Sequence, residues 1–232
     1  MLDPIPEKGM PSLSKAYKII TSKLLNVEIE SNINVRMMYS ELGMNNSIDL
    51  CYVRKEVLEK LIIAQSSLPE GLFLRIWDAW RPFELQKELF EVYSEKIINK
   101  FHLRELSEKD RISVISKYVS VPYFDKLRAP VHTTGGAVDV TLIDNYGCEL
   151  NMGTGFDSFS PKTHTDYFES TNNEEIKKNR RILYRAMTLA GFTNLPSEWW
   201  HYDYGDVFWS YYTESPVMYE GIASLKEVDN IE

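Results

Sequence analysis

An aspartate inside an apolar, β-forming segment is the feature that most restricts how this chain can fold. The segment reads Ala137-Val-Asp-Val-Thr-Leu-Ile143, and its β-branched and aliphatic residues predict a buried strand. Aspartate is unfavourable within a strand, and a buried carboxylate needs a partner or a metal ion. Asp139 therefore predicts a polar site at the core, in which the carboxylate meets either an arginine or a metal.

A histidine shortly before this strand bears on that choice. His132 is followed by Gly135 and Gly136, and glycine adopts backbone conformations that other residues avoid. The chain can thus turn so that His132 and Asp139 meet at one point. The alternative is a loop histidine without a ligand role and an aspartate paired with an arginine.

A second pairing of a carboxylate with a histidine lies in Glu198-Trp-Trp-His201. Residues at this spacing can project to one side of a turn or short helix. The two tryptophans between them would exclude water and lower the local dielectric, which raises the pKa of a carboxyl group and suits a general base. The alternative is an aromatic core segment with a hydrogen-bonded histidine.

Together the two segments supply His132, Asp139 and His201 as ligands, with Glu198 left free. Catalytic zinc sites keep three protein ligands and an open position for water. The remaining carboxylate then activates that water. The joint pattern favours a catalytic metal site over either segment's structural alternative.

An arginine follows a further predicted strand, in Asp78-Ala-Trp-Arg81-Pro82. From the end of a strand, Arg81 could face a cleft and stabilise an oxyanion. The alternative is a surface ion pair between Arg81 and Asp78.

Four segments of the chain resemble the D-alanyl-D-alanine dipeptidases of the vancomycin-resistance type, and they follow one another in the order found in that family. These are zinc peptidases related to bacterial D,D-carboxypeptidases and to the hedgehog signalling domain. The family patterns His-x-x-Gly-x-Ala-x-Asp and Glu-x-Trp-His match at residues 132–139 and 198–201. The segments at residues 78–82 and 152–157 match as well. The resemblance spans roughly residues 72–204.

The resemblance implies a cytoplasmic zinc dipeptidase that acts on a small dipeptide, D-Ala-D-Ala above all. One zinc ion per chain would be bound by His132, Asp139 and His201. Glu198 would take a proton from the water and pass it to the leaving amine. Arg81 would steady the carbonyl oxygen as it gains charge. Asp157 would lie near the free ammonium group of the substrate, and a homodimer is consistent with the resemblance.

The chain departs from the family where the dipeptide is recognised. The family carries a serine two places before the first zinc histidine, and here Pro130 stands there, followed by Val131. Proline has neither an N–H donor nor a hydroxyl. Met37 and Met38 occupy the place where an aromatic residue is expected. A D,D-carboxypeptidase, a dipeptidase of other specificity and a non-catalytic zinc-containing binding module therefore stay open as alternatives.

Composition narrows the partners and the location. The formal net charge of −8 argues against nucleic acid or an anionic membrane as a partner. No stretch approaches the ~18 apolar residues of a membrane span. Cys51 and Cys148 fit neither a zinc nor a redox motif, and the polar N-terminus lacks the apolar core of a signal peptide, so we expect a reducing, cytoplasmic setting.

Helical and strand patterns alternate irregularly along the chain, which favours an α+β fold with a small, mostly antiparallel sheet flanked by helices around a central zinc cleft. Residues 1–232 are expected to form a single domain with a flexible tail from about residue 222. Helices are predicted over residues 11–26, 53–65, 82–100, 109–119 and 173–190. Strands are predicted over residues 27–39, 72–79, 136–143 and 199–204. His164 is expected to be an exposed loop residue.

Overall fold

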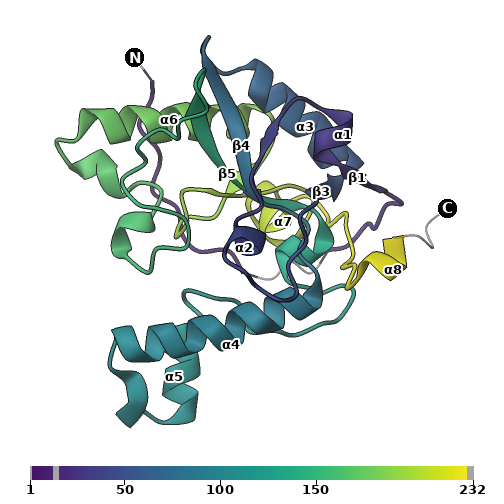
Figure 1. Cartoon of the computed structure of the whole chain (residues 1–232), viewed down its shortest axis with the longest axis vertical. Coiled ribbons are helices and arrows are strands. Elements are labelled where there is room, and N and C mark those ends of the chain that lie inside the picture. Colours follow the sequence, from purple (N-terminus) through teal and green to yellow (C-terminus); the bar gives the residue numbers. More distant parts are fainter. Residues whose placement is uncertain (1, 13–15, 229–232) are drawn as a thin grey trace.

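The computed structural model describes residues 2–12 and 16–228 (Figure 1). The strands are β1 (Leu24–Asn26), β2 (Asn34–Val35), β3 (Tyr52–Arg54), β4 (Leu72–Asp78), β5 (Ala137–Asp144), β6 (Thr193–Asn194) and β7 (His201–Asp203). The α-helices are α1 (Val27–Glu30), α2 (Met38–Glu41), α3 (Lys55–Ser66), α4 (Phe83–Lys100), α5 (Glu108–Ile115), α6 (Glu174–Leu189), α7 (Val207–Thr213) and α8 (Leu225–Val228).

The main sheet has five strands in the order β2-β4-β5-β7-β6. β2 runs parallel to β4, and the other neighbouring pairs are antiparallel. β1 and β3 form a separate two-stranded antiparallel sheet. The predicted α+β class with a mostly antiparallel sheet is confirmed. The helices expected over residues 53–65, 82–100, 109–119 and 173–190 form as α3, α4, α5 and α6.

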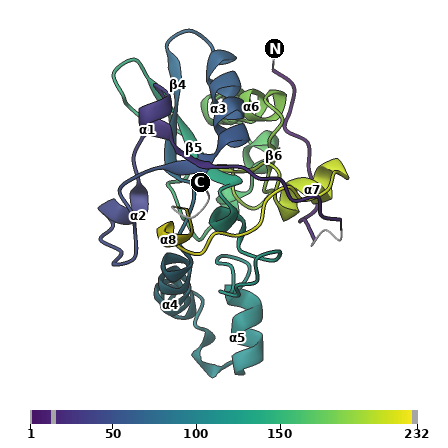
Figure 2. The same ribbon diagram turned by 90° about the vertical axis from the view of Figure 1, so that its right-hand side faces the viewer.

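The main core lies between the sheet and the helices α3 and α6, which contact each other (Figures 1 and 2). Leu61 of α3, Met187 of α6 and Val140 of β5 belong to one buried apolar cluster. Gly191 has a φ of 102° directly after α6, a conformation that glycine adopts without steric cost. The predicted stop of this helix is therefore confirmed.

Helices α4 and α5 pack against each other and extend away from the sheet (Figure 2). They have an apolar cluster of their own, which includes Leu89 and Ile97 of α4 and Ile115 of α5. Tyr39 and Tyr93 belong to the same cluster. Within the described ranges, every helix is too short or too polar to cross a lipid bilayer.

The helix predicted over residues 11–26 is wrong within the described part of the segment. The backbone N–H of Lys18 donates to the carbonyl of Val217 at 2.8 Å, so the chain is extended here and pairs with a distant segment. This pairing overrides the helical spacing of the apolar residues. Residues 13–15 lie outside the described residues.

The strand predicted over residues 27–39 forms only at β2. The flanking residues form α1 and α2 instead. Asn26 explains the start of α1, because its side chain accepts hydrogen bonds from the backbone N–H groups of Glu28 and Ile29. This N-cap signal is present in the sequence, but the prediction gave more weight to the β-forming residues of the segment.

The C-terminal segment is attached to the body of the protein as far as Ala223, whose carbonyl accepts from the backbone N–H of Phe83 at 3.0 Å. The Ile222 side chain is buried, its N–H donates to the carbonyl of Thr133 at 2.9 Å, and its carbonyl accepts from the indole of Trp80 at 2.9 Å. The short helix α8 follows, and residues 229–232 lie outside the described residues. The single-domain organisation and the flexibility of the tail stay predictions.

Candidate metal centre and active site

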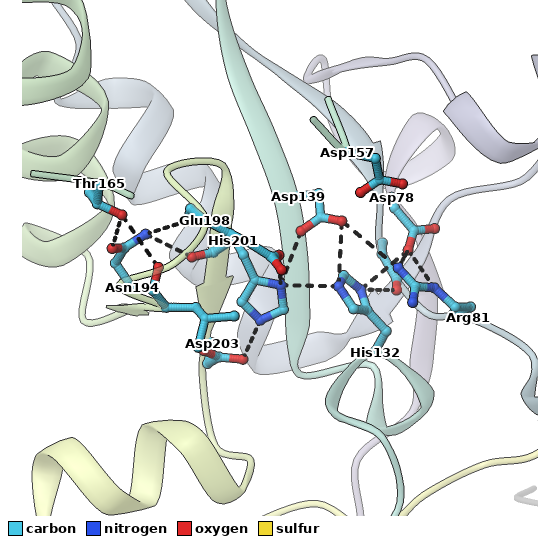
Figure 3. Close-up of polar contacts among 12 residues, drawn as sticks. Asp78, Arg81, His132, Asp139, Asp157, Thr165, Asn194, Glu198, His201 and Asp203 are labelled. Atoms are coloured by element: carbon cyan, nitrogen blue, oxygen red, sulfur yellow. Dashed lines mark hydrogen bonds and ion pairs between the residues drawn. The ribbon is translucent and has the colours of Figure 1, made fainter. Parts of the chain in front are cut away.

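The register of three central strands aligns their polar residues in one row (Figure 3). Asp139 of β5 pairs with His201 of β7 on one side and with Asp78 of β4 on the other. A register shift between Ile76 and Asp78 makes this possible, since Ile76 pairs with Val140, which faces away from the row. The irregularity turns Asp78 to the face that carries Asp139.

His132 enters this row from a short 3-10 helix, η2 (Val131–Thr134), directly before β5. Gly135 ends η2 with a φ of 74°, and a Cβ atom added there would lie 2.6 Å from Cδ2 of Leu24. A residue with a side chain would therefore be strained at this turn. The glycine lets the chain reverse so that His132 reaches Asp139.

The three predicted ligands meet at one point. Nε2 of His132 lies 3.2 Å from Nδ1 of His201 and 3.5 Å from Oδ2 of Asp139, and one ligand atom from each residue lies within 4.8 Å of the others. Figure 3 shows the Asp139 carboxylate linked to both imidazoles. Two imidazole nitrogens and one carboxylate oxygen form a ligand set that catalytic zinc sites use.

The outer nitrogens of both imidazoles are held in place. Nδ1 of His132 contacts the carbonyl of Ala79 at 2.9 Å, and Nε2 of His201 contacts Oδ1 of Asp203 at 2.8 Å. Partners of this kind fix ring orientation and leave the inner nitrogen free for a metal. All three candidate ligands are buried.

The electrostatics of the cluster favour an added positive charge. Burial would raise the pKa of Asp139, but His132 and His201 outweigh it and hold the pKa of this carboxyl below its usual range. Burial would lower the pKa of His201, but Asp203 and Asp139 hold it well above its usual value. A buried site with this demand for cationic charge fits a divalent metal ion.

Glu198 lies beside the candidate ligands without joining them. Its Oε2 is 3.9 Å from Nδ1 of His201, and 27% of its side chain is exposed. Burial raises the pKa of Glu198 to about 8, opposed by His201 and reinforced by the charges of Asp139 and Asp157. A cation held by the neighbouring ligands would shift it back toward the ionised form.

A residue that sequence reasoning missed fixes the turn between Glu198 and His201. The side-chain amide of Asn194 donates to the carbonyls of both residues, at 3.1 and 2.9 Å. Its Oδ1 accepts a hydrogen bond from Thr165 at 2.7 Å. The Glu198 carboxylate and the His201 imidazole therefore leave one rigid turn (Figure 3).

Arg81 forms a buried ion pair in place of the surface pair left open above. Its Nε and Nη2 donate to Oδ2 of Asp78 at 2.9 and 2.7 Å, and Nη1 donates to Oε1 of Gln86 at 2.7 Å. Nη2 also lies 3.9 Å from Oδ2 of Asp139. The guanidinium is thus locked beside the candidate metal cluster, and the Gln86 contact was not foreseen.

Asp157 faces the same space from a loop, with a φ of 51° that few non-glycine residues adopt. Its Oδ2 accepts hydrogen bonds from the hydroxyls of Tyr39 at 2.8 Å and Tyr93 at 2.7 Å. Burial raises the pKa of Asp157 to about 6 despite these bonds, and the charge of Asp139 adds to the effect. Tyr39 provides the aromatic residue expected at Met37 or Met38.

One pocket, which we call the catalytic pocket, has a volume of about 70 Å³. Pro130 and Val131 form part of its wall, at the place where the family has its serine. All six residues singled out from the sequence line it: Arg81, His132, Asp139, Asp157, Glu198 and His201.

The buried His-Asp-His cluster and the carboxylate beside it in one pocket are the arrangement of a metallopeptidase active site. More narrowly, the chain belongs to the Peptidase M15 family of D-Ala-D-Ala dipeptidases, whose family profile matches residues 42–217. It is 27% identical over 191 residues to the D-alanyl-D-alanine dipeptidase of Synechocystis, covering 75% of this chain and 77% of that one. It is 30% identical over 157 residues to the Escherichia coli D-alanyl-D-alanine dipeptidase, covering 66% of each chain.

Two solved structures are similar in part. One is a variant of the vancomycin-resistance D,D-pentapeptidase VanY in complex with Zn(II), at 13% identity and a TM-score of 0.39, covering 81% of this chain and 82% of that one. The other is VanYB in complex with D-alanine-D-alanine, at 15% identity and a TM-score of 0.41, covering 82% and 89%.

Proposed function

We propose that this protein is a zinc-dependent dipeptidase that hydrolyses D-Ala-D-Ala. One zinc ion per chain would be bound by His132, Asp139 and His201. The observation that carries the proposal is the convergence of these ligands with two further carboxyl groups, those of Glu198 and Asp157, on one small pocket. Two relatives that bear the name D-alanyl-D-alanine dipeptidase support the choice of substrate.

Zinc bound at this site would polarise the scissile carbonyl and acidify a water molecule. Glu198 accepts a proton from the attacking water and returns it to the leaving amine. Its half-buried position and raised pKa suit a group that must both accept and donate. The Asn194 contacts to the turn keep its carboxylate beside the ligand cluster.

Arg81 stabilises the carbonyl oxygen as it gains negative charge. Asp78 and Gln86 fix the guanidinium before substrate arrives, so little reorganisation is needed during the reaction. A purely structural metal site needs neither Arg81 nor Glu198. Their presence in the pocket argues against the alternative of a non-catalytic binding module.

Asp157 binds the free ammonium group of the dipeptide. Its carboxylate faces the pocket with two tyrosine hydroxyls as fixed neighbours. A peptide extended at its amino end has no ammonium group at this position and would leave a half-buried carboxylate without its partner. The arrangement thus favours a dipeptidase over the alternative D,D-carboxypeptidase.

The test compares D-Ala-D-Ala with N-acetyl-D-Ala-D-Ala by the release of free D-alanine from zinc-loaded protein. The proposal predicts release from the free dipeptide and at least about a 100-fold lower kcat/KM for the acetylated one, because the half-buried Asp157 carboxylate would lose its partner. Comparable rates for the two would assign a carboxypeptidase instead. A protein that holds zinc but cleaves neither would reopen the binding module.

We further propose a reducing, cytoplasmic location and a homodimer. Cys51 and Cys148 are both free thiols, which accords with a reducing compartment. The dimer rests on the family resemblance alone. Cell fractionation and sedimentation of the purified protein test the two statements separately.

A further inference from the structure

A second cavity opens beside the catalytic pocket, and we call it the side cavity. Its volume is about 160 Å³, compared with about 70 Å³ for the catalytic pocket, so the side cavity is the roomier of the two. Tyr118, Asp157 and Glu198 line both. These three residues form a shared wall, and the mechanism above uses only its catalytic side.

The shared wall determines which part of a dipeptide would meet the side cavity. The ammonium group of the N-terminal residue binds Asp157, and the scissile carbonyl of the same residue lies next to Glu198. Both groups are attached to one Cα atom, which must therefore sit at the shared wall. The side chain on that Cα would therefore start at a wall that also lines the side cavity. Because the catalytic pocket is small, the side cavity offers the larger space for a side chain bigger than methyl.

Away from the shared wall, the described lining of the side cavity has basic residues and no acidic ones. Lys117 and His164 line it, together with the hydroxyl groups of Ser158 and Ser160. Asp157 and Glu198 are its acidic lining residues, and both belong to the shared wall. None of the ion pairs formed within the described residues involves Lys117 or His164.

A buried arginine holds the part of the side-cavity wall that carries His164. Arg180 donates to the carbonyls of Met152 at 2.9 Å, Lys162 at 2.8 Å and His164 at 2.6 Å. Arg180 is 2% exposed, so these bonds are shielded from water. The loop that carries His164 is therefore fixed relative to α6, and the side cavity does not depend on a mobile surface loop.

We propose that the side cavity binds a carboxylate on the side chain of the N-terminal residue of the substrate. The preferred substrates would then include dipeptides that begin with an acidic residue, in addition to D-Ala-D-Ala. Lys117 and His164 would pair with the carboxylate, and the serine hydroxyls can donate to it. This inference rests on the proposed dipeptidase function and specifies its substrate class.

The test uses substrates of matched shape that differ in charge: D-Asp-D-Ala against D-Asn-D-Ala, and D-Glu-D-Ala against D-Gln-D-Ala. For zinc-loaded wild type, we expect the acidic dipeptide to have a kcat/KM at least about fivefold higher than its neutral counterpart in at least one of the two pairs. This ratio corresponds to the free energy of a partly exposed ion pair. The same preference should appear as a ratio of Kd values in Glu198→Ala, measured by calorimetry without turnover.

The variants assign the preference to the side cavity. Lys117→Gln should reduce the acidic-to-neutral ratio to about 2 or less, and Lys117→Glu should invert it. Lys109→Gln removes another exposed lysine, from α5, and should leave the ratio unchanged.

Equal Kd values for the acidic and neutral members in Glu198→Ala would overturn the inference, whatever the turnover. An undiminished ratio in Lys117→Gln would also overturn it. Acidic preference in binding without hydrolysis of any dipeptide by wild type would support the side cavity while refuting the proposed function.

Discussion

At the scale of single residues, the site depends on carboxyl groups whose surroundings drive their pKa values apart. Asp139 lies between two imidazoles and stays ionised, whereas burial raises the pKa of Glu198 to about 8 and that of Asp157 to about 6. Separation of this kind marks groups with different tasks in one active site. In the proposed function, these three groups would serve as a metal ligand, a proton carrier and an ammonium-binding group.

The pKa of Asp157 leads to a pH-dependent KM. Its carboxylate is charged above about pH 6 and neutral below it, so binding of the substrate ammonium should weaken as pH falls through about 6. We expect KM for D-Ala-D-Ala to rise over that range. Asp157→Asn should have a KM about 10-fold or more higher at pH 8, in line with the loss of a buried ion pair.

Steady-state kinetics between pH 5 and 8 check this assignment. The KM of Asp157→Asn should lack the rise that wild type shows near pH 6. An identical pH profile for KM in both proteins would remove Asp157 from the ammonium site.

Sequence reasoning predicted the residues with distinctive chemistry and missed those that serve them. His132, Asp139 and His201 were identified because a buried carboxylate near histidines has few explanations. Tyr93 was not predicted as a site residue, because nothing in its own segment shows that its hydroxyl meets Asp157. The role of Asn194 likewise becomes visible only in the fold, where its side chain bonds the turn between Glu198 and His201.

At the scale of elements, the positions of the site residues are determined by short strands and turns more than by the long helices. The shifted register of β4 turns Asp78 toward Asp139, and the β5–β7 register sets Asp139 opposite His201. The β5 strand was readable from its β-branched and aliphatic residues, but the irregularity of β4 was not, since it depends on the partner strand. The strand at β1 was missed for the same reason.

Gly135 is the turn residue on which the approach of His132 depends. We expect Gly135→Ala to lower the free energy of unfolding by about 1–3 kcal/mol, because of its left-handed backbone and the crowding by Leu24. Gly155→Ala is the matched control, since an added Cβ there meets nothing within 4 Å. Denaturant unfolding measures both, and equal stabilities of the two variants would contradict the role of this turn.

At the scale of the whole molecule, the α+β class and the mostly antiparallel sheet follow from the irregular alternation of helix and strand patterns. The position of the α4–α5 pair could not be predicted, because its inner face meets residues from distant segments such as Tyr39. The same arrangement brings Tyr93 and Tyr118 to the pocket opposite the sheet. The pocket thus lies between the sheet and this helical pair.

The most direct test of the account measures zinc content and D-Ala-D-Ala hydrolysis together in wild type, Glu198→Ala and His201→Ala. We expect one zinc per chain in wild type and in Glu198→Ala, with turnover in Glu198→Ala lower by about 10²–10⁴-fold, as for loss of a positioned acid–base group. His201→Ala should lose both zinc and activity. Near-wild-type turnover by zinc-loaded Glu198→Ala, or full zinc occupancy in His201→Ala, would contradict the assignment.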